Sequence, residues 1–333
     1  DYYASRGLGD VYKRQAIDLG TCNTVIFIKH KGIIFNEPTV IAVSETNNHT
    51  YTVGYEAAKL IGRTPQGIKI IHPLKNGVIA DLDATIQFIS AIFRFTKYSR
   101  YLKRSKIVIS APSDLTPVEK NALNQLGKKL GASKIVIENK AKMAAIGSDL
   151  DVNSSKGSMI VDIGGGTTDV AVLSVGKVVV SKSIPNAGLL IDEAIMRYMR
   201  VTHNMKIGEK NAEYIKMKIG SVGSNFENRL LQVSGVSVET SLPHSVIVTT
   251  QSISEVITPI VKDIVDCIRD ILFITPPELA GDIVENGISI SGGVALLNGL
   301  REALEQELNL PVRVTSDPLL STLEGCKISL RTI

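Results

Sequence analysis

Two short segments of the chain, one in each half, contain the residue types that bind phosphate groups. The first spans residues 18–24 and contains Gly, Thr and Asn; the second spans residues 162–169 and contains three consecutive glycines followed by two threonines. Both lie between apolar runs, so each is predicted to be the tight turn of a β-hairpin. Backbone N–H groups in such a turn can surround anionic oxygens, and Thr and Asn side chains add donors without negative charge. The sequence therefore predicts two phosphate-binding turns.

An aspartate begins each turn, at Asp18 and at Asp162. A carboxylate would repel a phosphate directly, but it suits a hydrated Mg²⁺, which keeps several of its waters and binds few carboxylates. Neither turn is a Walker A loop, because no Gly-Lys-Ser/Thr follows, and neither is a Rossmann turn, because a strand follows instead of a helix. Two ordinary hairpins that happen to contain glycine are the alternative interpretation. Because the turns match each other, including the aspartate, phosphate binding is favoured.

The length and composition of the chain are those of a globular protein with two domains. Its 333 residues are enough for two hydrophobic cores, and 44% of them are hydrophobic and 21% charged. No apolar run reaches the about 18 residues of a transmembrane helix. The net charge of +4 is too small to indicate nucleic-acid binding. The cysteines Cys22, Cys267 and Cys326 are widely spaced, which fits a reducing cytoplasm and gives no disulfide or metal pattern.

The first fifteen residues differ from the rest of the chain. They show neither helical nor strand periodicity, and they lack the apolar region of a signal peptide. A strand should lead into Asp18, but only Ala16 and Ile17 would remain of it. We therefore expect residues 1–15 to be a non-native segment.

Strands and helices alternate in the same way in both halves. In the first half we expect short strands within 25–55, a helix over 83–97, a strand over 107–110, a helix beginning near Thr116, a strand over 135–137, a helix over 143–150 and a linker at 153–157. In the second half we expect strands from 159 to 183, helices over 190–203 and 209–219, strands over 231–238 and 246–250, a helix over 253–273, a strand over 288–291 and a helix over 298–308. This order predicts a duplicated α/β fold, with mixed five-stranded sheets packed on helices and a cleft between the halves.

Seven motifs of the chain resemble those of the MreB family, the bacterial actin-like proteins within the superfamily of actin, DnaK-type chaperones and sugar kinases. They are IDLGTCNT at 17–24, NEPTVIAV at 36–43, GVIADLDA at 77–84, LGASK at 130–134, VDIGGGTTDVAV at 161–172, IGEKNAE at 207–213 and TPPEL at 275–279. The resemblance runs from about Ala16 to the end of the chain. The segment Ala141-Lys142-Met143 is similar to that of paralogues from wall-less helical bacteria.

The resemblance implies an actin-like (ribonuclease H-like) fold of two domains with a nucleotide cleft between them. Domain I would span 16–155, with a small subdomain at about 35–72, and domain II would span 156–320, with a small subdomain at about 190–252. A C-terminal helix within 321–333 would return to domain I. The implied cofactors are ATP and Mg²⁺, and the implied activity is assembly into homopolymer filaments that govern cell shape. The implied location is the cytoplasm, with a membrane surface and morphogenesis proteins as further partners and no nucleic acid.

The resemblance also assigns roles to individual residues. The phosphates would be held by one group from each turn: Gly20, Thr21, Cys22 and Asn23 from the first, and Gly164, Gly165, Gly166 and Thr167 from the second. The adenosine would lie on a further turn, formed by Gly292, Gly293, Val294 and Ala295. Val294 stands where a third glycine is usual, which would narrow that turn. The ribose and base would face a helix that carries Glu209, Lys210, Ala212 and Glu213, although a solvated helix face is the alternative interpretation.

Lys140 departs from the family pattern at the position where a glutamate orients the attacking water. A carboxylate can accept the proton of that water, whereas an ammonium has three donors and no acceptor. The sequence therefore predicts at most a weak ATPase, with Thr167 still present to position water. Glu138 could replace the expected glutamate only if the reaction tolerates a carboxylate displaced by about 6 to 7 Å along the strand.

Tyr101 and Leu102 lie among basic residues, which suggests an apolar loop tip on an anionic membrane. The alternative interpretation is a solvated basic loop with a packed leucine.

Three other functions share the fold. A DnaK-type chaperone needs a peptide-binding domain after the nucleotide domain, for which the chain leaves no residues. A sugar kinase needs a catalytic carboxylate beside a substrate hydroxyl, and we identify none. A plasmid-segregating actin relative would lack the TPPEL and LGASK segments.

Overall fold

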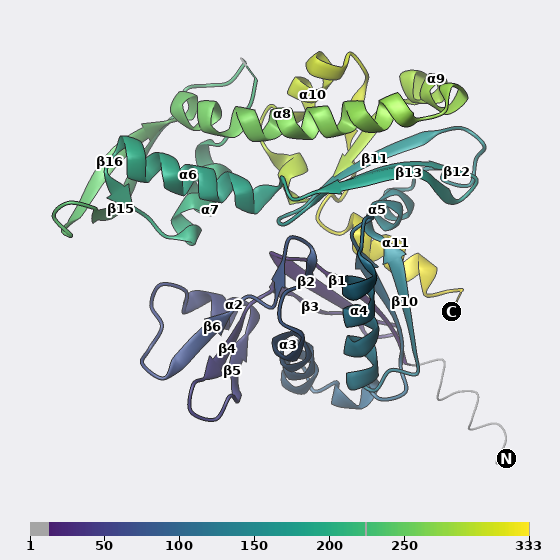
Figure 1. Cartoon of the computed structure of the whole chain (residues 1–333), viewed down its shortest axis with the longest axis horizontal. Coiled ribbons are helices and arrows are strands. Elements are labelled where there is room, and N and C mark those ends of the chain that lie inside the picture. The colour runs from purple at the N-terminus through teal and green to yellow at the C-terminus, as the bar shows by residue number, and fades with distance from the viewer. Residues whose placement is uncertain (1–12, 224, 333) are drawn as a thin grey trace. The chain divides into compact units, whose positions relative to one another are not determined.

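The computed structural model describes residues 13–223 and 225–332 (Figure 1). The described residues form two compact units. The first unit consists of the described residues up to Asp151 together with those from Leu320 onward, and the second unit is Val152–Leu319. Among the described helices, none is both long enough and apolar enough to cross a membrane.

The first unit is built on a five-stranded mixed sheet in the order β10-β9-β1-β2-β3. Its strands are β1 (Arg14–Leu19), β2 (Asn23–Ile28), β3 (Gly32–Pro38), β9 (Lys106–Ala111) and β10 (Lys134–Asn139). The first three form an antiparallel meander, while β9 runs parallel to both β1 and β10. The predicted mixed five-stranded sheet is therefore confirmed for this half.

Strand β1 begins two residues earlier than we expected. Arg14 and Gln15 pair with β9, and the buried Gln15 side chain donates from Nε2 to the carbonyl oxygen of Tyr101 at 2.6 Å. The expectation that no strand residue precedes Ala16 is therefore wrong. Arg14 and Gln15 are held in strand conformation by pairing with β9, which is distant in the sequence. Residues 1–12 of the expected non-native segment lie outside the described residues.

Helices cover both faces of this sheet because its strands alternate between two apolar faces. Ile17, Ile107 and Ile109 share a core with α3 (Leu82–Phe95) and α4 (Pro117–Lys129). The intervening Ala16 and Val108 share a second core with α5 (Lys140–Gly147) and α11 (Ser321–Ser329). This period of two places successive side chains of one strand on opposite faces.

The start of α4 was predicted correctly. The Thr116 hydroxyl accepts from the Glu119 N–H, the Glu119 carboxylate accepts from the Thr116 N–H, and Pro117 occupies the first turn. This reciprocal arrangement is a capping box, which satisfies two N–H groups that the helix itself cannot bond.

A smaller layer completes the first unit. It consists of the sheet β5-β4-β6, made of β4 (Ile41–Ser44), β5 (Thr50–Val53) and β6 (Ile68–Ile71), with α2 (Gly54–Lys59) packed on it. The unit also contains the hairpin of β7 (Leu74–Lys75) and β8 (Val78–Ile79), which contacts α4, and the 3₁₀ helix η1 (Ser99–Tyr101), which contacts α3.

The second unit repeats the plan, with a five-stranded sheet in the order β13-β12-β11-β17-β18. Its strands are β11 (Ser158–Ile163), β12 (Thr168–Ser174), β13 (Lys177–Ile184), β17 (Ile288–Ser291) and β18 (Val312–Val314). Strands β11, β12 and β13 are an antiparallel meander, and β17 runs parallel to both β11 and β18. The same order and directions in both units confirm the predicted duplication.

Long helices pack on one face of this sheet. The 25-residue α8 (Thr250–Ile274) crosses β12 and β13 beside α6 (Gly188–Thr202), as Figure 1 shows. Next to α6 lie α7 (Glu209–Ile219) and the small sheet of β14 (Met205–Lys206), β15 (Leu230–Ser237) and β16 (Pro243–Thr249). The unit also contains α9 (Pro277–Asn286), the 3₁₀ helix η2 (Gly293–Leu296) and α10 (Leu300–Leu308).

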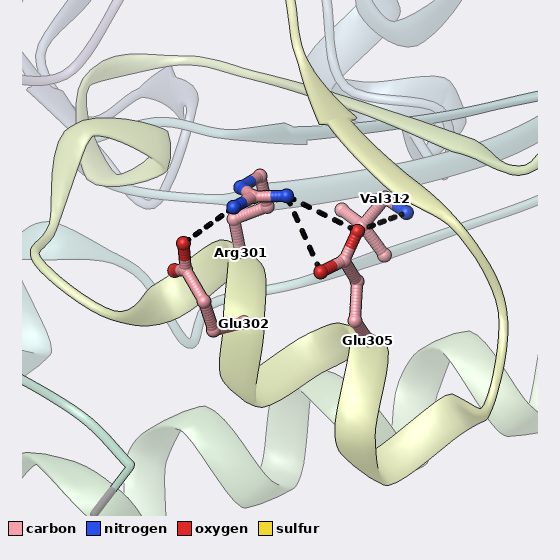
Figure 2. A network of polar contacts seen from close by, with 4 residues as sticks. All are labelled: Arg301, Glu302, Glu305 and Val312. Atoms are coloured by element: carbon pink, nitrogen blue, oxygen red, sulfur yellow. Dashed lines mark hydrogen bonds and ion pairs between the residues drawn. The ribbon is translucent and has the colours of Figure 1, made fainter. Parts of the chain in front are cut away.

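A polar network fastens α10 to the edge strand β18 (Figure 2). Glu305 Oε1 accepts from the backbone N–H of Val312 at 3.1 Å, and both Glu305 oxygens accept from Arg301 at 3.3 Å. Arg301 also donates to Glu302 at 2.6 Å. Because exposed ion pairs contribute about 0–1 kcal/mol, the backbone contact matters more: it gives an N–H at the sheet edge a partner.

Candidate functional site

The first predicted phosphate turn connects β1 to β2. The N–H of Gly20 donates to the carbonyl oxygen of Asn23 at 3.1 Å. The Thr39 hydroxyl donates to the Gly20 carbonyl oxygen at 2.7 Å, and the Gly77 N–H donates to the Thr21 hydroxyl at 2.8 Å. A Cβ at position 20 would lie 2.5 Å from the Asn23 oxygen, so only glycine allows this closure.

The second predicted phosphate turn connects β11 to β12 and is closed in the same way. The Gly164 N–H donates to the carbonyl oxygen of Thr167 at 2.9 Å, again three residues later in the chain. The buried Thr167 hydroxyl donates to Asp169 Oδ2 at 2.9 Å. Two turns far apart in the sequence therefore have the same local closure.

The predicted magnesium carboxylates occupy equivalent places in the two sheets. Asp18 and Asp162 lie near the ends of β1 and β11, just before the turns, and each is opposite a serine of the neighbouring parallel strand. Ser110 donates to Asp18 Oδ1 at 2.6 Å, and Ser291 donates to Asp162 Oδ1 at 2.5 Å. Sequence reasoning paired neither serine with its aspartate, since the partners lie 92 and 129 positions apart.

These residues fit a magnesium nucleotide. Each turn has the backbone and hydroxyl groups that bind phosphate oxygens, and each begins with a carboxylate held by a neutral hydroxyl. In the described part of the chain, no three or more His, Cys, Asp or Glu side chains form a metal-binding group. The water-mediated binding of Mg²⁺ by Asp18 and Asp162 stays a prediction.

The N-terminus of α6 lies against the second phosphate turn. The N–H groups of Gly188 and Leu189 donate to the carbonyl oxygens of Gly164 and Gly165 at 3.1 and 2.8 Å. A Cβ at position 188 would lie 3.3 Å from Val294 of the predicted adenosine turn. Gly188 therefore adjoins two of the predicted nucleotide-binding segments, which the sequence did not indicate.

The predicted adenosine turn follows β17. Gly292 has a φ of 85°, Gly293 is exposed, and Val294 and Ala295 are buried. The valine that replaces the usual glycine thus packs into the unit beside Gly188. Its effect on the width of the turn stays a prediction.

Helix α7 has one exposed polar face and one buried face. Glu209, Lys210 and Glu213 are exposed. Their exposure is consistent with both interpretations, a helix that faces a ligand and a helix that faces solvent. Ala212 is fully buried in the hydrophobic core. The helical period turns the side chain of position 212 inward, where it packs α7 onto the unit, so this side chain does not support the predicted contact of Ala212 with a nucleotide.

A buried ion pair joins α7 to α6 beside the second phosphate turn. Lys216 Nζ donates to Asp192 Oδ2 at 2.8 Å and to the carbonyl oxygen of Gly188 at 3.2 Å. The other carboxylate oxygen of Asp192 is buried and has no hydrogen-bond partner among the described residues. Burial therefore raises the pKa of Asp192 from 3.8 to about 6, although Lys216 opposes the shift; Glu213 and Glu209 add to it.

The raised pKa of Asp192 predicts a pH dependence of stability. An acid whose pKa is higher in the folded state stabilises the fold below its ordinary value of 3.8, and it loses that contribution as the pH rises to about 6. We expect the unfolding free energy of the wild type, relative to that of Asp192→Asn, to fall by about 2 kcal/mol between pH 4 and pH 7. Urea titrations of both proteins measure it, and a difference that stays constant or rises with pH would contradict the assignment.

Lys140 and Glu138 have distinct surroundings. Lys140 is the first residue of α5, after Asn139, whose side chain accepts from the Lys142 N–H at 2.9 Å. Glu138 Oε1 accepts from the Ser329 hydroxyl of α11 at 3.2 Å. Glu138 is therefore in contact with α11, and its role as a substitute for the glutamate that the resemblance implies stays a prediction.

The predicted membrane tip at Tyr101 and Leu102 is wrong. Both side chains are buried, at 9% and 8% exposure, in the core that contains α3 and α4. Tyr101 packs edge-to-face on Tyr98 with ring centroids 5.5 Å apart. The neighbouring basic residues Arg100, Lys103 and Arg104 are exposed.

Comparison with known proteins gives a consistent result. The family model described as MreB/Mbl protein matches residues 12–333. The chain is 38% identical over 314 residues to the cell shape-determining protein Mbl of Bacillus subtilis (strain 168), with 94% of each protein covered. It is 37% identical over 315 residues to the cell shape-determining protein MreB of Escherichia coli (strain K12), covering 93% of this chain and 91% of that protein.

A solved structure extends the similarity to the backbone. The crystal structure of MreB 5 of Spiroplasma citri bound to AMPPNP matches with a TM-score of 0.91 at 36% identity, and 96% of both chains is covered. The predicted actin-like α/β fold is confirmed by this match.

Proposed function

Because the chain belongs to the MreB/Mbl family, we propose that it is an actin-like protein that binds ATP, assembles into filaments of identical subunits and determines cell shape. The match between the two turns carries the proposal: both follow an aspartate, and both are closed by an N–H that donates to the carbonyl three residues later. The nucleotide in the Spiroplasma relative supports it. The family match over residues 12–333 favours this function over a chaperone-type ATPase or a sugar kinase.

We propose that each group of binding residues contacts the part of the nucleotide that the sequence predicts for it. The phosphates would contact residues 20–23 and 164–167, the adenosine would contact residues 292–295, and the ribose and base would contact the exposed face of α7 at Glu209, Lys210 and Glu213. Asp18 and Asp162 would hold Mg²⁺ through water. When bound, that ion would neutralise phosphate charge.

Three further parts of the proposal rest on the family resemblance. The small sheets β5-β4-β6 and β14-β15-β16 would be the cores of the two small subdomains. Hydrolysis of ATP would be weak, because Lys140 replaces a carboxylate. The protein would work in the cytoplasm with morphogenesis proteins and a membrane surface as partners, without the buried Tyr101 and Leu102 as anchors.

Assembly that depends on nucleotide is the direct test. We expect the purified protein to pellet at high speed, and to form filaments in negative-stain images, with ATP and Mg²⁺. Without nucleotide, or with EDTA, it should stay in the supernatant. A protein that binds ATP in calorimetry but never pellets over a range of concentrations and salts would contradict the filament function, and one that binds no ATP would contradict the whole proposal.

A further inference from the structure

Each predicted magnesium carboxylate is held by a serine on the adjacent parallel strand. In the first unit Asp18 of β1 pairs in register with Ser110 of β9, and in the second unit Asp162 of β11 pairs with Ser291 of β17. The serine hydroxyl donates to one carboxylate oxygen in both cases, at 2.6 and 2.5 Å. The same pair therefore occurs in two separate sheets, at the same place in each topology.

Both serines are buried at the ends of strands. Ser110 and Ser291 are 4% and 0% exposed, and Asp162 is 2% exposed. A buried hydroxyl costs free energy unless it is hydrogen-bonded, so an apolar residue would serve packing alone better. In β9 the three residues before Ser110 are fully buried and apolar. The strand has a hydroxyl at position 110, where it lies opposite the carboxylate of Asp18.

A serine has the right chemistry to orient a carboxylate that works with a cation. Its hydroxyl gives one directional hydrogen bond and carries no charge, so it fixes the carboxylate without competing with Mg²⁺ as a lysine or arginine would. Residues that hold metal ligands in this way typically contribute 10- to 100-fold to metal affinity.

We propose that Ser110 and Ser291 are positioning residues for the magnesium nucleotide, each acting through its aspartate. The inference rests on the proposed binding of ATP and Mg²⁺. Neither serine contacts the nucleotide in this assignment. Their contribution is to the orientation of Asp18 and Asp162, on which the water-mediated contact with the ion depends.

The test is a Mg²⁺ titration of ATP affinity by calorimetry, on the wild type and on Ser110→Ala and Ser291→Ala. In EDTA we expect the variants to bind ATP within about twofold of the wild type. We expect Mg²⁺ to increase the affinity of the protein for ATP. The Mg²⁺ concentration at which half of this increase is reached should be about tenfold higher in each variant than in the wild type. Ser110→Thr and Ser291→Thr keep the hydroxyl and should restore the wild-type titration.

Matched controls come from the same segments. Ser289→Ala removes a buried hydroxyl two positions before Ser291 on β17, where the register partner is Ile160. Ser105→Ala removes a buried hydroxyl that donates to the carbonyl oxygen of Leu102. Neither should move the Mg²⁺ midpoint. If an alanine variant does not fold, a cysteine at that position keeps the volume with a weaker donor, and the same direction of shift is expected.

The outcomes separate this inference from the proposed function. An unchanged Mg²⁺ midpoint in Ser110→Ala and Ser291→Ala, with normal ATP binding by the wild type, would overturn the positioning role alone. An equal loss of ATP affinity with and without Mg²⁺ would also overturn it, because the serines would then act only on the fold. A wild type that binds no ATP would overturn the proposed function itself.

Discussion

Replacing Gly325 by alanine is expected to lower the unfolding free energy of the first unit by about 3 kcal/mol. Helices α5 and α11 pack so closely that a Cβ on Gly325 would lie 2.6 Å from the carbonyl carbon of Met143. Reciprocally, a Cβ on Gly147 would lie 2.6 Å from the backbone nitrogen of Gly325. Because these neighbours are backbone atoms, no side-chain rotation relieves the overlap.

The same contact explains why the effect should spread beyond the two helices. Met143 of α5 and Leu323 and Cys326 of α11 form one core with Ala16 and Val108 of the central strands. Separating the helices would open this core directly beneath β1, which ends in the first phosphate turn. We therefore expect Gly147→Ala to have an effect of similar size, and the double variant to show less than the sum, since both act on one contact.

Gly281→Ala provides the control with the opposite sign. Gly281 lies in α9, and a Cβ there meets nothing within 4 Å. Alanine in an open helix position should stabilise the protein by about 0.5–1 kcal/mol. Urea unfolding followed by circular dichroism measures the three single variants and the double variant. Equal stability of Gly325→Ala and the wild type would show that the helices can separate freely.

Local patterns were sufficient to predict most of the elements. The capping residues around Thr116, the continuous apolar runs of β9 and β11, and the apolar period of α8 depend on neighbours within a few positions. Helix α9 was missed because its apolar period consists of little more than Leu279 and Ile283, a short signal within ten residues. Strand β18 was missed because three residues are too short for a pattern.

The errors at the candidate site have a different cause. Tyr101 and Leu102 among basic residues have the composition of a membrane loop, but their burial depends on contacts from β1 and on the core of the first unit. Ser110, Ser291 and Lys216 acquire their partners only when distant segments pair. The turns themselves could be predicted, because closure between residues 20 and 23 and between 164 and 167 is a local event.

Lys140→Glu is expected to raise the rate of ATP hydrolysis by about 100-fold or more. In the wild type, position 140 is the first residue of α5, and the first turn of that helix carries no acidic residue. A carboxylate there could accept the proton of the attacking water, which the ammonium cannot do. Release of phosphate from ATP and Mg²⁺, measured at protein concentrations below and above assembly, gives the rate for the free and the assembled protein.

Two matched variants separate the carboxylate from the change of charge. Lys140→Gln removes the positive charge but supplies no carboxylate, and Lys142→Glu makes the same charge change two positions along α5. Negative charge at a helix N-terminus stabilises by about 0.3–1 kcal/mol, so Lys140→Glu and Lys142→Glu should gain similar stability. Only Lys140→Glu should gain activity. If the wild type already hydrolyses ATP rapidly, the ammonium at position 140 does not limit the reaction. If Lys140→Gln matches Lys140→Glu, the gain comes from the loss of the positive charge, and the proton-accepting role of the carboxylate is contradicted.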